Sequence, residues 1–115
     1  MNRYQILIEY EGTLYNGWQI QKKGKSIQEN IEIVLSKLLK EKIKIYGSGR
    51  TDTGVHAKEQ SAHFDTTNKI IQKDKLLNSL NFFLNKKKIS ILKIKKKNKL
   101  FHSRYSAKER RYTYL

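Results

Sequence analysis

The spacing of the apolar residues restricts the fold of this chain more than any other feature. From Arg3 to Tyr10 apolar side chains recur at every second position, the period of a strand with one buried face. From Ser26 to about Lys40 they recur at every third or fourth position, the period of a helix. Continued along the chain, the spacing predicts strands over 3–10, 41–46, 58–65 and 89–95, and helices over 26–40 and 71–84. The order β-α-β-β-α-β is typical of the ferredoxin-like α+β fold, in which two helices cover one face of an antiparallel sheet. We therefore expect a single α+β domain over residues 1–115.

Individual positions sharpen this prediction. Ser26 and Glu29 have the spacing of a capping box, which places the start of the first helix. The buried face of that helix is expected to contain Ile27, Ile31, Val34, Leu35, Leu38 and Leu39. The second helix is expected to bury Ile71, Leu76, Leu77, Leu80, Phe83 and Leu84. In the first two strands, the side chains expected to point into the core are Tyr4, Ile6, Ile8, Tyr10, Ile43 and Ile45. In the last strand, Ile89, Ile91 and Lys93 are expected on one face, and Leu92 and Ile94 on the other. The second face of the sheet is left uncovered, so another domain or a nucleic acid is expected to cover it.

Charge predicts the kind of partner. The chain has 25 Lys and Arg against 10 Asp and Glu, a formal net charge of +15. An excess of this size favours a polyanion, and nucleic acid is the usual one. The base composition of the source genome is a second cause of the high Lys count, and we expect both to contribute. The runs 86–88 and 95–97 are expected to position a nucleic acid rather than to read its sequence.

The remaining composition bears on compartment and metal. The chain has no cysteine, so it has neither a disulfide framework nor a thiolate metal site. No apolar segment resembles a signal peptide or a membrane span, so a cytoplasmic location and no membrane partner are expected. The three histidines do not follow a known ligand spacing, and the pair His63 and Asp65 on one strand face is a weak indication of a metal site.

The segment 47–57, Gly-Ser-Gly-Arg-Thr-Asp-Thr-Gly-Val-His-Ala, contains three of the six glycines. Such a composition is typical of a tightly bent loop that approaches another molecule closely. Asp52 lies two positions from Arg50, and a nearby cation together with loop N–H donors favours the ionised carboxylate. Asp52 is therefore a candidate nucleophile or base.

Two other interpretations of Asp52 stay open from the residues alone. Asp commonly caps its own turn, and that structural role is as probable here as a chemical one. Asp52-Thr53-Gly54 is also the active-site tripeptide of aspartic proteases, and a chain of this length could form such an active site as a homodimer. That mechanism needs two carboxylates sharing a proton, and Arg50 would keep both ionised, so the protease is a minor alternative.

Aromatic and basic residues gather in two further segments. Tyr15 and Trp18 stand among amides and glycine, where they would either stack on unpaired bases or cover the edge of the core. Lys22 and Lys23 follow in a basic loop suited to phosphate contact. After the last strand, arginines alternate with tyrosines in residues 101–115, which favours contacts to phosphate and base together.

The chain resembles the TruA-type tRNA pseudouridine synthases. The resemblance begins with Gly49-Arg50-Thr51-Asp52-Thr53-Gly54-Val55-His56-Ala57, where that family usually has Ala or Gly in place of Thr53. It continues in the same order through the segments 10–12, 15–19, 26–28, 101–107 and 111–112, and covers essentially the whole chain.

The resemblance implies isomerisation of uridine to pseudouridine in the anticodon stem-loop of tRNA, at nucleotide positions 38 to 40, without cofactor or metal. Asp52 matches the family's catalytic aspartate, Arg50 an arginine that holds the target nucleotide out of the stack, and Tyr112 a tyrosine that stacks on the uracil. Tyr112 as an ordinary core tyrosine is the competing interpretation. Thr51 and His56 are expected to shape the loop. Lys22, Lys23, Arg104 and Arg111 are expected to contact the RNA backbone.

Length is the departure from the family, whose members have two ferredoxin-like halves facing each other across a basic cleft and usually form homodimers. This sequence corresponds to the first half and the opening of the connecting strand. We therefore expect a fragment of an enzyme that is homodimeric in full-length form, and both an active and an inactive isolated fragment agree with the sequence. The alternative from another class is a non-catalytic RNA-binding module of the same fold, which would leave the loop around Asp52 unexplained.

Overall fold

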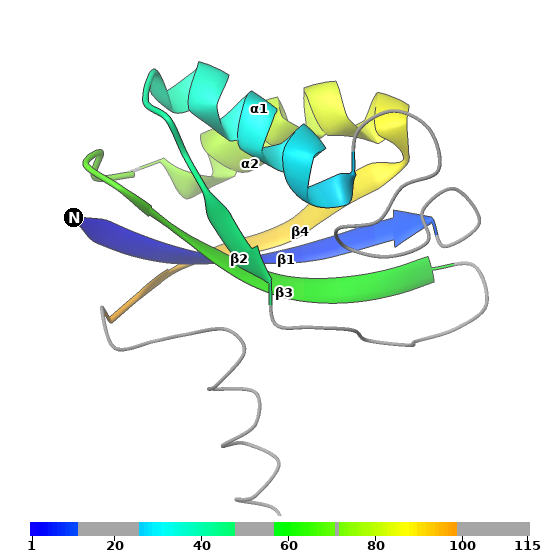
Figure 1. Cartoon of the computed structure of the whole chain (residues 1–115), viewed down its shortest axis with the longest axis horizontal. Helices are drawn as coiled ribbons and strands as arrows, with labels where there is room; N and C mark the ends of the chain where they lie inside the picture. The colour runs from blue at the N-terminus through cyan, green and yellow to red at the C-terminus, as the bar shows by residue number, and fades with distance from the viewer. Residues whose placement is uncertain (12–25, 48–56, 71, 99–115) are drawn as a thin grey trace, which may run out of the picture.

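The structure is a computed structural model, which describes residues 1–11, 26–47, 57–70 and 72–98. Its elements are β1 (Asn2–Glu11), α1 (Ile27–Leu39), β2 (Ile45–Gly47), β3 (Ala57–Thr66), α2 (Lys73–Leu84), the short 3₁₀ helix η1 (Asn85–Lys87) and β4 (Ile89–Lys97). The four strands form one antiparallel sheet in the order β2-β3-β1-β4. Both helices lie on the same face of this sheet and run in opposite directions (Figure 1). The predicted α+β, ferredoxin-like fold is confirmed.

The first helix begins where the capping box predicts. The Glu29 N–H donates to Ser26 Oγ at 3.1 Å, and the Ser26 N–H donates to Glu29 Oε1 at 3.1 Å. The helix ends with Lys40 in the left-handed region at φ 54°, where its N–H donates to the Ser36 carbonyl. Both ends of α1 are therefore fixed by local hydrogen bonds, which satisfy main-chain groups that a helix otherwise leaves without partners.

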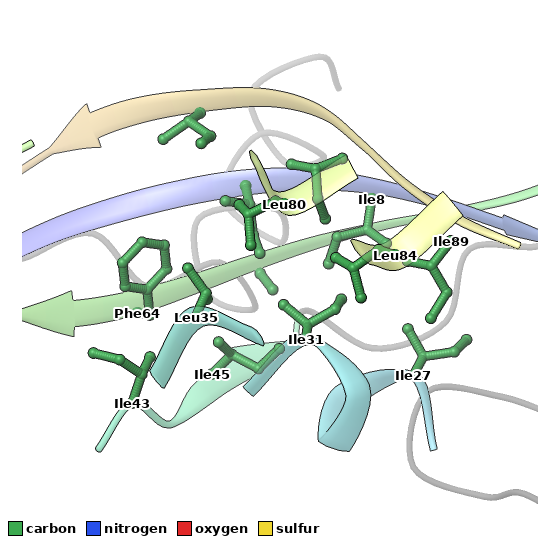
Figure 2. Packing of buried hydrophobic residues seen from close by; sticks show 14 of the residues in the cluster. Ile8, Ile27, Ile31, Leu35, Ile43, Ile45, Phe64, Leu80, Leu84 and Ile89 are labelled. Atoms are coloured by element: carbon green, nitrogen blue, oxygen red, sulfur yellow. The ribbon is translucent and has the colours of Figure 1, made fainter. Parts of the chain in front are cut away.

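The core fills the space between the helices and the sheet (Figure 2). From β1 it takes every second residue, and from α1 the fully buried Ile27, Ile31 and Leu35. Tyr4 and Phe64, opposite each other on β1 and β3, stack with ring centroids 5.8 Å apart. Val34, Leu38 and Leu39 pack against this cluster, as the helical spacing predicts.

The second strand is shorter than predicted. Residues 41–44 were expected to be extended with 45–46, yet β2 begins only at Ile45. The Ile43 N–H donates to Ser36 Oγ at 2.9 Å, and the Glu41 carboxylate accepts from Thr66 Oγ1 and from the Thr67 N–H. The N–H groups of Ile43 and Thr67 are thus bonded to side chains and do not take part in strand pairing. Ile43 and Ile45 are buried as expected.

The residues on the two faces of the last strand differ from the prediction. Leu7 pairs with Lys93 but Ile8 pairs with Ile91, so Leu92 is an extra residue at a β-bulge. The bulge reverses the alternation, and Ile94 is buried on the same face as Ile89 and Ile91. Lys93 and Leu92 are both exposed, so neither the grouping of Lys93 with Ile89 and Ile91 nor that of Leu92 with Ile94 holds.

The second helix buries fewer residues than predicted. Leu80 and Leu84 are buried, and Leu76 and Leu77 pack partly against the core. Phe83 was expected inside but is 38% exposed, and its ring meets that of the more exposed Phe82 edge to face. Ile71 lies outside the described residues.

Candidate nucleic-acid site at one end of the sheet

The residues that the sequence predicts as functional lie outside the described ranges. These are Asp52, Arg50, Thr51 and His56 within 48–56, Lys22 and Lys23 within 12–25, and Arg104, Arg111 and Tyr112 within 99–115. Their predicted roles remain predictions. What the structure describes is the set of strand and helix ends to which these three segments are attached.

Two of the segments are attached at the same end of the sheet. The last residue of β1, Glu11, pairs with the first residue of β3, Ala57. Segment 12–25 therefore leaves the sheet beside the point at which segment 48–56 rejoins it. The other boundary of segment 48–56 is Gly47, which pairs with Ala62 farther along β3.

The start of α1 lies toward this end too. Ile27 lies at the same side of the core as Ile89 (Figure 2), and Ile89 pairs with Tyr10, one residue before the end of β1. Segment 12–25, which joins β1 to Ser26, thus begins and ends at one end of the domain. The sheet and α1 bring the boundaries of the basic loop and of the glycine-rich loop together, although the loops are far apart in sequence.

The third segment starts at the opposite end. Lys97, the last residue of β4, pairs with Arg3 near the beginning of β1. The chain from 99 onward therefore begins a full strand length away from the Glu11–Ala57 pair.

The sheet face without helices carries charge as well as hydrogen bonds. Arg3 and Asp65 face each other across β1 and β3, with Arg3 Nε donating to Asp65 Oδ1 at 2.8 Å and Arg3 Nη2 donating to Asp65 Oδ2 at 2.9 Å. The Arg3 hydrogen bond is the main cause that lowers the pKa of the Asp65 carboxyl, and the same contact raises the pKa of Arg3. Both carboxylate oxygens of Asp65 are thus used by Arg3, so the sequence hint of a His63–Asp65 metal site gains no support from the geometry.

Neighbouring positions on this face hold further polar side chains, of which Gln5 and His63 are buried. Gln5 Nε2 donates to Ser61 Oγ at 2.8 Å, and the rings of Tyr46 and His63 stack at 5.2 Å. Lys93, Lys95 and Lys97 face Leu7, Gln5 and Arg3 across the β4–β1 pair. Sequence reasoning named this face as uncovered but none of these residues as a site, because only the strand register shows which side chains share it.

Other features of the described residues do not indicate a metal site, a pocket at the predicted residues or a membrane span. Among them, no group of three or more His, Cys, Asp and Glu side chains is placed to hold a metal ion. A shallow depression lined by Gln72, Lys73, Asp74 and Lys75 lies at the start of α2 and includes none of the predicted residues. Within the described ranges, neither helix has the length and apolar character needed to cross a bilayer.

Comparison with known proteins assigns the family. A family model described as tRNA pseudouridine synthase matches residues 6–106. The chain belongs to this family. Among curated relatives named tRNA pseudouridine synthase A, that of Pelagibacter ubique is 62% identical over 115 residues, covering 100% of this chain and 47% of the relative. Those of Anaplasma phagocytophilum and Neorickettsia sennetsu are 44% and 46% identical, each covering 97% of this chain and 46% of the relative.

The chain thus spans about half the length of the curated relatives it matches. The matched range includes the whole of segment 48–56 and therefore both Arg50 and Asp52. It ends before Arg111 and Tyr112. The family match leaves the aspartic protease alternative without support.

Proposed function

We propose that this chain forms one half of a tRNA pseudouridine synthase, which isomerises uridine to pseudouridine in the anticodon stem-loop of tRNA. The observation that carries the proposal is the family match over residues 6–106, which includes the Arg50–Asp52 loop. The attachment of that loop and of the basic segment 12–25 at one end of the sheet supports it, because an RNA bound there would meet both.

Asp52 is the proposed catalytic residue. The reaction breaks the N-glycosidic bond between ribose and uracil, turns the uracil, and joins carbon 5 of the base to the ribose. An anionic carboxylate serves this by attacking the ribose, by attacking the base, or by removing a ribose proton. All three routes need Asp52 ionised at neutral pH, which the neighbouring Arg50 favours.

Arg50 and Tyr112 are proposed to hold the target nucleotide. A planar cation suits an extruded nucleotide because it contacts phosphate and stacks on a base, and a tyrosine ring covers the uracil. Thr51 and His56 shape the loop, while Lys22, Lys23, Arg104 and Arg111 contact phosphates.

Chain length permits Tyr112 to reach the loop although its segment starts at the other end of the sheet. The ten residues of β1 span about 33 Å. An extended chain from Asn98 to Tyr112 reaches up to about 46 Å, which exceeds the length of the sheet. The proposed contact between Tyr112 and the target uracil at this loop is therefore compatible with the length of the chain.

The second half of the relatives is the proposed source of the opposite wall of the cleft and of the homodimer contact. The sheet face without helices, with its Arg3–Asp65 pair and the lysines of β4, is polar enough to face such a cleft rather than a dry core. We place the activity in the cytoplasm, where tRNA is the substrate.

The decisive experiment is a chimera in which this chain replaces the matching segment of the Pelagibacter ubique relative. Purified chimera is incubated with unmodified tRNA, and pseudouridine is mapped by base-specific chemical labelling and primer extension. We expect pseudouridine in the anticodon stem-loop. In Asp52→Asn the rate of its formation should fall by about 100-fold or more. Asp74→Asn, which removes an exposed carboxylate on α2, is the matched control and should retain activity.

Each outcome separates the alternatives. A chimera that binds tRNA without modifying it would favour the non-catalytic RNA-binding module. A chimera whose Asp52→Asn variant keeps full activity would refute the assignment of the catalytic residue.

A further inference from the structure

The outer surface of the helix layer carries an aromatic pair that the core does not explain. Phe82 is 65% exposed and Phe83 38% exposed, and their rings meet edge to face with centroids 5.1 Å apart. Adjacent exposed phenylalanines are costly on a helix surface unless something packs against them. Both residues belong to α2, and the two helices cover the face of the sheet opposite the one that carries Arg3 and Asp65 (Figure 1).

A lysine ammonium group lies near each of the two rings. Lys86 Nζ lies 5.1 Å from the centroid of Phe82, and Lys37 Nζ from α1 lies 6.0 Å from the centroid of Phe83. Ile33, 48% exposed, lies one turn before Lys37 on the same side of α1. We call Ile33, Lys37, Phe82, Phe83 and Lys86 the helix-layer patch. It joins two helices and combines rings with cations.

The charges around the patch favour an anionic partner. Lys75 and Lys87 on the same helix layer are exposed, in a chain of net charge +15. The acidic residues nearest to the patch along the helices are Glu32, whose carboxylate accepts from the Ile45 N–H, Glu29, whose carboxylate accepts from the Ser26 N–H, and Asp74, two turns before Phe82. A second copy of this chain would bring like charges together, which opposes self-association through the patch.

We infer that the helix-layer patch is a binding site for single-stranded RNA, with an unpaired base stacked on Phe82 and phosphates beside Lys37 and Lys86. Aromatic rings among cations are the usual means of holding unpaired nucleotides without reading their sequence. The inference rests on the proposed function because it takes RNA as the polyanion. It assigns RNA contact to the helix layer, which covers the face of the sheet opposite the one that carries Arg3 and Asp65.

Two probes of equal length separate stacking from charge. The full chain is titrated with a labelled oligouridine and with a labelled abasic oligonucleotide, which keeps the phosphates and lacks the bases, and anisotropy is recorded. We expect tighter binding of oligouridine. Phe82→Ala should weaken oligouridine binding about 10-fold and leave abasic binding nearly unchanged, because only the stacked base loses its partner.

The matched variants define the contribution of each group. Phe82→Trp keeps an aromatic surface and should retain the preference for oligouridine. Lys86→Ala should weaken both probes equally and reduce the salt dependence of binding, whereas Lys42→Ala, an equal loss of charge at an exposed residue after α1, should change binding less. Because Phe82 is mostly exposed, its variants should fold as the parent does, which circular dichroism checks.

The inference is overturned if the parent chain binds both probes equally, or if Phe82→Ala binds oligouridine as tightly as the parent. It is also overturned if Phe82→Ala changes only self-association in sedimentation or only binding to a poly-glutamate peptide, since the patch would then serve a protein. None of these titrations involves turnover, and all are repeated in Asp52→Asn. Failure of the proposed isomerase activity would therefore leave their result unaffected.

Discussion

Replacing Asn81 should destabilise the domain, because its side chain bonds to the main chain of Ile91 on β4. Asn81 lies on α2, where its Oδ1 accepts from the Ile91 N–H at 2.7 Å and its Nδ2 donates to the Ile91 carbonyl at 3.0 Å. Its amide thus pairs with β4 as a neighbouring strand would, at the outer side of the four-strand sheet that the structure describes. The two bonds join helix to strand next to the bulge at Leu92.

The magnitude follows from the two bonds and from helix propensity. Each partly buried hydrogen bond contributes about 1 kcal/mol net, so their loss costs about 2 kcal/mol. Alanine favours the helix over asparagine by roughly 0.6 kcal/mol, so Asn81→Ala should lower the free energy of unfolding by about 1.4 kcal/mol. Asn78→Ala, at an exposed position of the same helix, gains the helix propensity of alanine and should be slightly stabilising.

Urea unfolding followed by far-UV circular dichroism measures this difference. The free energies of unfolding of Asn81→Ala and Asn78→Ala should differ by about 2 kcal/mol, with equal denaturant slopes. Asn81→Ala should also aggregate more readily, because it exposes main-chain groups at the side of a strand. Equal stabilities of the two variants would refute the view that the Asn81 amide substitutes for a strand partner.

Three further predictions concern stability. Ser26→Ala removes the side-chain half of the capping box and should cost about 1 kcal/mol in urea unfolding, whereas an unchanged midpoint would mean that α1 does not depend on its cap. Leu35→Ala, at a fully buried position, should cost about 3 kcal/mol, and a loss below about 1 kcal/mol would contradict the packing in Figure 2. Asp65→Asn should cost about 1 kcal/mol at pH 7. Because the pKa of Asp65 is lowered in the folded state, this cost is present above the unfolded pKa near 4 and disappears as pH falls through the folded pKa, so unfolding curves of parent and Asp65→Asn should converge in acid.

The proposed RNA site and the helix-layer patch make different demands on the fold. The proposed reaction needs a loop held at strand ends, and the described strands supply fixed boundaries at Gly47 and Ala57. The patch needs only an exposed helix surface. If both proposals hold, one small domain contacts RNA on two sides, and substitutions on α2 should change RNA affinity without changing the chemistry at Asp52.

The sequence by itself determined the order of elements, the start of α1 and most of the core. These depend on spacing and on contacts three or four residues apart, as between Ser26 and Glu29, and such contacts are local. The same local patterns also singled out the Asp52 loop and its resemblance to the tRNA pseudouridine synthases, the family to which the chain belongs.

Tertiary structure alone decided the features that depend on pairing between distant residues. The bulge that turns Ile94 inward and Lys93 outward follows from the register between β1 and β4. The late start of β2 follows from Glu41 bonding to Thr66 and Thr67 across the fold, and the exposure of Phe83 from how α2 is rotated against the sheet. Apolar spacing records which residues prefer to leave water, but it does not record the partner strand or the rotation of a helix, since these are set by contacts between segments far apart in the chain.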